Sequence, residues 1–262
     1  PGILPLAVQE PMMDSQHANQ LEQKEGNVQC AEGTGIEVGP VRPDEVATVA
    51  QLHFEFFGPE AAGRSVANLG PQFLEQIFYR LNLENPYFFC DVARHEGQVI
   101  GISVYTTRRQ KLVRYMLCHQ LIRVAWTTLK LICRSWSLFT LVLSNIRFVG
   151  SESLPSNRPA EGWWLVLCVQ PEYRSKEFKE RTGVSVADLL IDLMEREMQQ
   201  HGCDCWSGMA PVDKGAINNL LKRHGARPVG TIRAQGLEMW HYLKELGPEA
   251  ATSEEQGPKS AE

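Results

Sequence analysis

The sequence has no long apolar run and no large excess of either charge. Its longest charge-free apolar-rich stretch near the middle spans residues 135–146, whereas a helix needs about 20 residues to cross a bilayer. A formal net charge of −5 gives no overall attraction to nucleic acid, whose phosphates favour basic proteins. Residues 1–16 combine neither a basic start nor a continuous apolar run, so they do not resemble a secretory signal. These absences favour a cytoplasmic protein without membrane-spanning helices.

Paired cysteines are also scarce. The seven cysteines are scattered, and the only close pair is Cys203 and Cys205. No second pair or histidine cluster accompanies it to complete a zinc site. We therefore expect reduced cysteines and no metal site.

The chain divides into one domain between two polar tails. Residues 1–34 mix Gln, Glu, Gly and Asn, and residues 247–262 are rich in Glu, Ser, Gly, Pro and Ala. Neither segment can bury enough apolar surface to stay ordered, so both are predicted to be disordered tails. Residues 35–246 are long enough for a single sizeable core.

Strand and helix patterns alternate within that domain. Strands are expected at 36–41, 87–93, 99–105, 163–169 and 203–209 and in a hairpin over 226–243, and helices from 43, at 70–81, from 183 to about 202 and at 214–224. This order favours an α/β domain with helices on both faces of a mixed sheet.

The most informative segment joins a strand to a helix through a polar loop. Trp163–Val169 is a continuous apolar run, as expected for a covered central strand. Apolar residues then recur with helical spacing after Gly183. A glycine at a helix start lets backbone N–H groups approach an anion, and the helix dipole adds partial positive charge. Arg174 and Arg181 in the loop can bind phosphates, although an ordinary turn explains the spacing equally well.

The same residues resemble a known family. Val169–Arg174 reads VQPEYR, and Gly183–Ser185 reads GVS ahead of the helix. The pattern resembles the acyl-CoA motif of the GNAT acyltransferase superfamily, in which a strand, a V-x-P-x-x-(Q/R)-x-x-G-x-(G/A) loop and a helix hold the pyrophosphate. The resemblance covers about residues 35–246. Segments 53–57 and 68–74 are similar to a subgroup with an insertion between the third and fourth strands.

The resemblance implies a GNAT-like mixed, mostly antiparallel central sheet flanked by helices, with a helical insertion, and acetyl-CoA as co-substrate. The residues that it assigns to acyl-CoA binding are Leu167, Cys168, Val169, Arg174, Arg181, Thr182, Gly183, Val184 and Ser185. Six extra residues, 177–182, lengthen the phosphate loop, so we expect that it bulges or that Arg181 takes over the phosphate role. Cys168, inside an apolar strand, is interpreted as a buried small side chain rather than a nucleophile.

The side-chain chemistry departs from the family's usual set. Leu221 stands where many members carry a tyrosine acid, and Trp163 where some carry a glutamate base. Acyl transfer to an amine needs a neutral nucleophile, a polarised carbonyl and a proton for the leaving thiolate. Glu161, before the central strand, and His53 or Glu55, in the first helical region, are the candidate bases, although surface or loop roles are commoner for such residues.

These observations predict an acyl-CoA-dependent N-acyltransferase. Its simplest reaction is acetyl transfer from acetyl-CoA to a primary amine of a small metabolite or amino sugar. The alternative is a catalytically degenerate protein of the same fold that binds acyl-CoA, a membrane surface or a protein partner.

Residues 108–150 form a strongly basic segment, with eight basic residues and no Asp or Glu. Arg123, Lys130 and Arg134 share one helical face and apolar residues occupy the other, which predicts a basic amphipathic helix. The helix is interpreted as a lid over the acceptor site, as a peripheral contact with an anionic membrane, or as a binding surface for an anionic acceptor such as a lipid-linked or glycan molecule. Nucleic acid is not expected, because no aromatic platform or recognised module accompanies the charge.

Overall fold

The computed structural model describes residues 28–31, 33–58, 66–119, 158, 160–234 and 237–247. The described residues form one eight-stranded sheet with the order β1-β2-β3-β4-β5-β6-β8-β7. The strands are β1 (Gln29–Ala31), β2 (Ile36–Pro40), β3 (Phe88–His95), β4 (Gln98–Thr106), β5 (Glu161–Val169), β6 (Cys205–Pro211), β7 (Arg227–Ala234) and β8 (Leu237–Glu245). Neighbouring strands are antiparallel except for β5 and β6, which run parallel.

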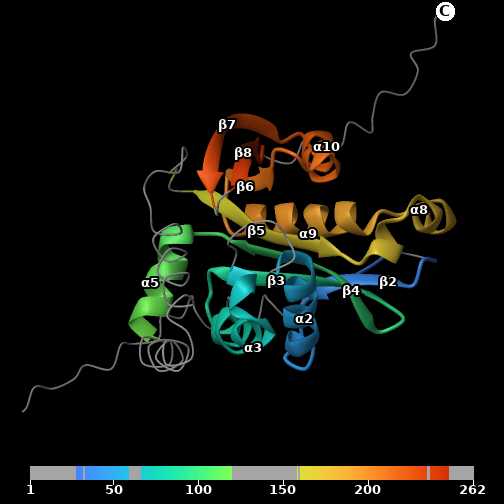
Figure 1. The fold of residues 1–262 in the computed structure, drawn as a ribbon, viewed down its shortest axis with the longest axis horizontal. Coiled ribbons are helices and arrows are strands. Elements are labelled where there is room, and N and C mark those ends of the chain that lie inside the picture. The colour runs from blue at the N-terminus through green and yellow to red at the C-terminus, as the bar shows by residue number, and fades with distance from the viewer. Residues whose placement is uncertain are drawn as a thin grey trace, which may run out of the picture.

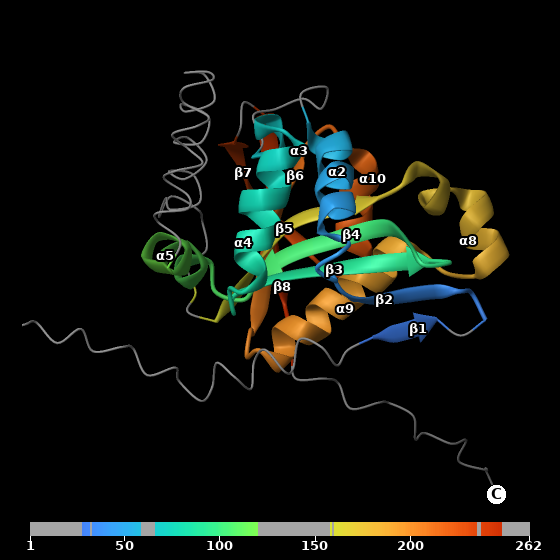
Figure 2. The same cartoon turned by 90° about the horizontal axis from the view of Figure 1, so that it is seen from below.

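Helices cover both faces of this sheet. One face carries α2 (Val46–Phe57), η1 (Val66–Leu69), α3 (Pro71–Phe73), the π-helical turn η2 (Leu74–Tyr79) and α4 (Arg80–Leu83), and the other carries α9 (Val186–Gln200) and α10 (Gly215–Arg223). Figures 1 and 2 show α2 and α3 across the sheet from α9. The predicted α/β fold, with a mixed and mostly antiparallel sheet between helices, is confirmed.

Three further helical segments lie at the edges of this arrangement. They are α5 (Arg109–His119), η3 (Pro171–Arg174) and α8 (Lys176–Thr182). Helices α5 and α8 lie at opposite ends of the molecule in both views (Figures 1 and 2). Strands β4 and β5 are antiparallel neighbours. Helix α5 follows β4 and helix α8 follows β5, so the two helices lie at opposite ends of the central strand β5.

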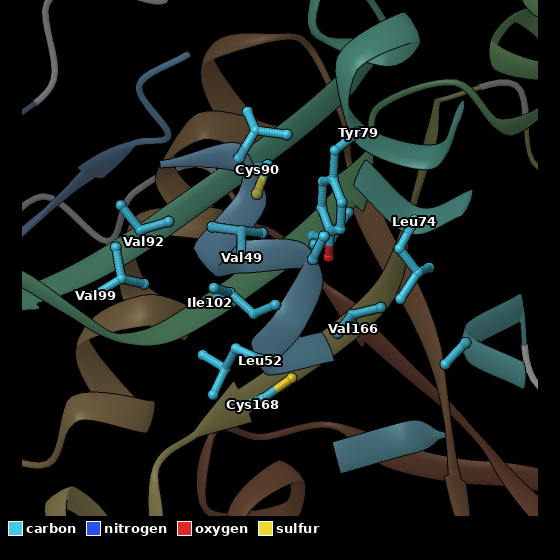
Figure 3. Packing of buried hydrophobic residues seen from close by; sticks show 14 of the residues in the cluster. Val49, Leu52, Leu74, Tyr79, Cys90, Val92, Val99, Ile102, Val166 and Cys168 are labelled. Atoms are coloured by element: carbon cyan, nitrogen blue, oxygen red, sulfur yellow. The ribbon is translucent and has the colours of Figure 1, made fainter. Parts of the chain in front are cut away.

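Apolar side chains on alternate positions of the central strands meet the α2 side of the core. Figure 3 shows Val49 and Leu52 of α2 together with Ile102, Val166 and Cys168 of the sheet. Successive strand residues point to opposite faces, so these positions turn one continuous apolar surface towards the helix. The packing fixes the position of β5 relative to α2.

The turn between β3 and β4 follows from its two central residues. Glu96 has φ 52° and Gly97 has φ 78°. Two successive positive φ angles are what a two-residue type I′ hairpin turn requires. The predicted strands on either side are confirmed, with bounds within two residues of those expected.

The structure corrects two expectations about the chain. Strand β1 lies within residues 1–34, which were expected to be a tail, because it pairs with β2 and extends the sheet by one edge strand. The residues added after Arg174 form helix α8 instead of a bulged loop. Ser175 Oγ accepts the Phe178 N–H at 3.2 Å and so begins α8, and Gly183 ends it with φ 72°.

The basic insertion is described only in part. Its first residues form helix α5, whereas Arg123, Lys130 and Arg134, which carry the predicted amphipathic helix, lie outside the described residues. Among the helices that are described, none is long and apolar enough to span a bilayer.

Candidate functional site

The central parallel strands β5 and β6 separate along their length. They pair at three positions, the last being Trp163 with Ser207. Beyond this point β6 continues to Pro211 paired only with β8, while β5 continues to Val169 paired only with β4. The sheet therefore divides between two strands that start side by side.

A β-bulge lies at the start of this divergence. Val104 pairs with Val166 and Tyr105 with Trp164, which leaves Leu165 as the extra residue of β5. A bulge bends its strand and increases the local twist. The bulge at Leu165 accounts for the direction in which β5 leaves β6.

The backbone of β5 beyond the bulge points alternately towards and away from β4. Gln170 N donates to Ile100 O at 2.9 Å, and antiparallel pairs alternate between bonded and non-bonded positions. Counting back, Cys168 directs its N–H and C=O to β4, whereas Leu167 and Val169 direct theirs to the opposite side. No strand among the described residues pairs with that side. Two of the three predicted backbone sites thus face the open edge, and Cys168 does not.

The side chain of Cys168 lies in the core. It is 2% exposed and packs beside Leu52 of α2 (Figure 3). Burial raises the pKa of the Cys168 thiol well above its usual value, so thiolate is disfavoured. This environment agrees with the interpretation of Cys168 as a buried small side chain.

Helix α9 begins next to the end of β5. Val186 and Leu190 pack in the same apolar cluster as Val169. Ser185 is the N-cap, with its Oγ accepting the Asp188 N–H at 3.4 Å and its carbonyl accepting the Leu189 N–H at 3.1 Å. The N–H groups that come before Asp188 in the first turn of α9 have no acceptor within the helix. The α9 N-terminus is therefore suited to bind an anion.

Two predicted residues serve the connection rather than the helix start. Gly183 adopts its left-handed conformation to end α8, so it is not the first residue of the anion-binding helix. Thr182 Oγ1 bonds the Phe178 carbonyl at 2.8 Å and accepts the Val184 N–H at 3.3 Å. Together these contacts hold the backbone between α8 and α9 in one shape.

The two predicted phosphate-binding arginines lie on different parts of this connection. The guanidinium of Arg174, in η3, lies 5.5 Å from the Phe56 ring at the end of α2. Arg181, in the last turn of α8, lies 5.3 Å from the Phe178 ring. Both side chains are exposed, so both can add positive charge near the α9 N-terminus.

Glu161 lies at the other end of β5. Its side chain is 8% exposed, its Oε1 accepts a hydrogen bond from the Ser207 hydroxyl, and its Oε2 accepts the Arg158 N–H at 3.3 Å. Paired strand positions share a face, so the pairing of β5 with β6 sets Glu161, Trp163 and Ser207 on one side of the sheet. The Glu161 carboxylate is therefore buried and hydrogen-bonded, and it lies near the point where β5 diverges from β6.

His53 has a different environment. It is 2% exposed among aromatic rings, and its Nδ1 lies 2.9 Å from the Tyr79 hydroxyl oxygen. Burial lowers its pKa to about 3, so the imidazole is neutral at pH 7. The structure places His53 in the α2 core and not with Glu161. Glu55, on the same helix, is exposed.

Sequence reasoning missed two side chains that lie with Glu161. His241 of β8 stacks on the Trp163 indole at 5.8 Å, and the Arg109 guanidinium of α5 lies over the same indole at 5.2 Å. His241 is fully buried, and neither ring nitrogen has a hydrogen-bond partner among the described residues. The buried Nη1 of Arg109 has none there either. The only sequence signal was a histidine among alternating apolar positions of the last strand.

Electrostatics couple these groups. Burial lowers the pKa of His241, the Glu161 carboxylate acts to raise it, and Arg109 lowers it further. The net shift is downward, so the imidazole is neutral at pH 7. Burial likewise lowers the pKa of Arg109, against the opposing effect of Glu161. A neutral base thus lies near a carboxylate that favours its protonated form.

Strand register places His241 level with the bulge. If β5 and β6 stayed paired beyond Trp163, Leu165 would lie opposite Met209, which pairs with His241 on β8. The imidazole therefore lies where the strands diverge, and it shares a face with Trp163. This brings together an open backbone edge, a buried base and a half-buried guanidinium.

Comparisons with known proteins bear on the fold. No protein-family model matches the chain, and no curated protein sequence matches it. An N-acetyltransferase structure from Staphylococcus aureus Mu50 has a TM-score of 0.50 and 11% identity, over 81% of this chain and 99% of that one. A putative acetyltransferase from Salmonella typhimurium, solved with its cofactor acetyl-CoA, has a TM-score of 0.50 and 10% identity, over 83% of this chain and 97% of that one. At such identities the likeness establishes the fold alone, which the chain shares with these acetyltransferase structures.

Proposed function

We propose that the chain is an acyl-CoA-dependent N-acyltransferase that transfers an acetyl group to a primary amine. The observation that carries this proposal is the divergence of β5 from β6 after Trp163, next to the N-terminus of α9. An extended thioester can lie along the open backbone edge of β5 while its phosphates meet the first turn of α9. The shared fold with a structure that holds acetyl-CoA supports this choice of co-substrate.

The proposed phosphate contacts come from the backbone N–H of Ser185 and from the N–H groups in the first turn of α9, since the Val184 N–H already bonds Thr182 Oγ1. Arg174 and Arg181 flank this segment and can reach phosphate oxygens as exposed, flexible cations. The thioester carbonyl would accept a hydrogen bond from the N–H of Leu167 or Val169, the two groups that face away from β4. Such a donor stabilises the oxyanion formed when an amine attacks.

His241 is the group best placed to accept the proton of the amine. As the nitrogen attacks the thioester carbon, its proton passes to the neutral imidazole, and Glu161 stabilises the imidazolium that results. The tetrahedral intermediate then breaks its C–S bond, and the imidazolium returns the proton to the CoA thiolate. The products are an amide and free CoA. Glu161 keeps its predicted place in the catalytic group, and His53 has none in this scheme.

The first test is a calorimetric titration of acetyl-CoA with two matched variants at the α9 N-cap. Asn and Asp cap helices about as well as Ser, so Ser185→Asn and Ser185→Asp both preserve the helix start. Only the aspartate adds a negative charge where the phosphates are expected. We expect Ser185→Asp to weaken binding by about tenfold or more, which is about 1.4 kcal/mol, and Ser185→Asn to stay within about threefold of the original chain.

Equal affinities for the two variants would argue against phosphate binding at α9. No binding of acetyl-CoA at millimolar concentration would refute the proposed function. Thiol release with a panel of small amines and amino sugars then tests turnover. Binding without turnover on any amine would favour the degenerate acyl-CoA-binding protein instead.

The basic insertion is proposed to cover the acceptor side of the site. Helix α5, which begins it, carries Arg109 into contact with Trp163. The alternative role is a peripheral contact with an anionic membrane. Co-sedimentation with phosphatidylserine vesicles and with neutral vesicles at low salt separates the two, because only a membrane contact requires the anionic lipid.

A further inference from the structure

Two adjacent arginines at the start of α5 are used differently. Arg108 bonds the Thr107 carbonyl at 2.8 Å, the Gly202 carbonyl at 3.3 Å and Cys203 Sγ at 3.5 Å. These contacts join β4 to the end of α9. Within the described part of the chain, the buried Nη1 of Arg109 has no hydrogen-bond partner. Arg108 therefore stabilises the fold, whereas Arg109 has a buried donor that a ligand can use.

The position of Arg109 is nevertheless fixed. Its guanidinium lies over the Trp163 indole, and its Nη1 is shielded from solvent. A buried guanidinium nitrogen without an acceptor is unfavourable, because it has lost water and gained no partner. Glu161 acts on Arg109 electrostatically and raises the pKa of the guanidinium against the effect of burial. Such a group is suited to accept an anionic ligand.

The neighbouring charges favour an anion at Arg109 and a proton donor at His241. Arg109 is the first residue of α5, so the helix dipole adds partial positive charge there. The neighbouring residues Arg108 and Lys111 are also basic. His241 lies against the same indole as Arg109, and both imidazole nitrogens lack partners among the described residues. Arg109 and His241 thus both contact Trp163, and each has a buried nitrogen that a ligand can bond.

We propose that the acceptor is a primary amine that also carries a carboxylate or phosphate group, with Arg109 binding that anionic group while His241 faces the amine. The inference rests on the proposed acyltransferase function and narrows its substrate class. A guanidinium binds either anion through paired N–H donors. A site built to bond a charged group discriminates strongly against an analogue without it, because the buried donor is then left unpaired.

The test compares matched acceptors that differ in the anionic group. Suitable pairs are β-alanine with propanolamine, γ-aminobutyrate with aminobutanol, L-lysine with cadaverine, and phosphoethanolamine with ethanolamine. Thiol release from acetyl-CoA gives kcat/KM for each amine. For at least one pair we expect the anionic member to be favoured by about tenfold or more. The carboxylate and phosphate arms then show which anion the site takes.

Arg109→Gln should reduce that preference to within about threefold by raising KM for the anionic member alone. Arg109→Lys should retain part of the preference, because it keeps the charge and loses the paired donors. Arg114→Gln is the matched control, since Arg114 lies on the same helix and is exposed. It should leave the preference unchanged.

Three results would overturn the inference. They are equal or better turnover of the neutral member in every pair, an equal loss for both members in Arg109→Gln, and no turnover of any member although acetyl-CoA binds. In the last case the acyl-CoA site survives and only the acceptor class is wrong. Failure of acetyl-CoA to bind at all would overturn the proposed function and this inference together.

Discussion

Two regions of the sheet, around β3 and around β5, differ in whether their buried polar groups have partners within the chain. Near α2, Arg94 of β3 is 2% exposed and bonds both carboxylate oxygens of Glu45, at 2.6 and 2.7 Å, and the Pro40 carbonyl at 2.7 Å. Around β5, buried nitrogens of Arg109 and His241 have no partner among the described residues. Arg94 and His241 are both at most 2% exposed, so burial alone does not distinguish a structural group from a functional one.

What distinguishes them is whether the buried donors and acceptors are satisfied within the chain. His53 contacts the Tyr79 hydroxyl, and Tyr105 donates to Asp91 at 2.8 Å. Such groups hold elements together. An unsatisfied buried group lowers stability unless something else binds it. The region around β5 therefore carries the buried groups that a ligand would satisfy. Mutations in the two regions test this difference.

The largest expected effect is on stability, from removing the satisfied arginine. Arg94→Met leaves Glu45 largely buried without its main partner and should lower the free energy of unfolding by roughly 3–5 kcal/mol. Arg109→Met removes an unpaired nitrogen and should lower it by less than about 1 kcal/mol. Urea denaturation of both variants measures the difference.

Equal losses for the two methionine variants would remove the distinction between the regions. If Arg94→Met does not fold, Arg94→Lys provides the measurement. It keeps the charge but loses the two parallel bonds to Glu45, so it should still be less stable than Arg109→Lys.

The next effect is on catalysis, from the unsatisfied histidine. His241→Gln keeps a polar side chain but removes the base, so kcat should fall by about 100-fold or more. Because burial and Arg109 lower the pKa of His241 while Glu161 raises it, the net pKa lies below 6.5. The kcat/KM of the original chain should therefore fall as pH decreases through that value, and the variant should lack this decrease.

A pH–rate profile from pH 5 to pH 8 shows whether the acidic limb disappears. His53→Gln is the matched control, since His53 lies outside the site, and it should keep the acidic limb. A limb that persists in His241→Gln and disappears in His53→Gln would assign the base to the α2 core instead.

The sequence predicts the fold well where pattern and period agree. The apolar run of β5 and the helical spacing after Gly183 identify the central strand and α9, and the structure confirms both. Helix α8 was not predicted, because Lys176–Thr182 contains a single apolar residue, Phe178, and shows no amphipathic period. Its start depends on the Ser175 cap and its end on Gly183.

Only part of the candidate site could be predicted from the sequence. The backbone of Leu167 and Val169 and the start of α9 follow from local pattern, so the acyl-CoA segment could be predicted. Arg109 and His241 could not, because they meet only through the pairing of β4 with β5 and of β6 with β8. No spacing along the chain reports such a meeting. The sequence instead indicated His53, a histidine that the fold buries among aromatic rings.

A smaller effect concerns the pH dependence of stability through His53. Its pKa of about 3 in the folded chain lies below the 6.5 of an exposed histidine, so between these values the unfolded chain binds a proton that the folded chain does not. Acidification therefore destabilises the fold, by about 1.3 kcal/mol between pH 7 and pH 5.5. His53→Gln should lose about that much less over the same interval, as measured by urea denaturation at both pH values.

The smallest expected effect tests whether every unsatisfied group around β5 awaits a ligand. The Ser103 hydroxyl on β4 is fully buried and has no hydrogen-bond partner among the described residues. Ser103 pairs with Leu167 of the central strand β5 and carries no charge. Ser103→Ala removes a buried hydroxyl and should leave the free energy of unfolding unchanged or raise it by up to about 1 kcal/mol. If thermal unfolding shows this small gain and acetyl-CoA binding is unchanged, the hydroxyl is a structural defect of the fold. Weaker acetyl-CoA binding at unchanged stability would instead show that Ser103 belongs to the ligand-binding groups together with Arg109 and His241.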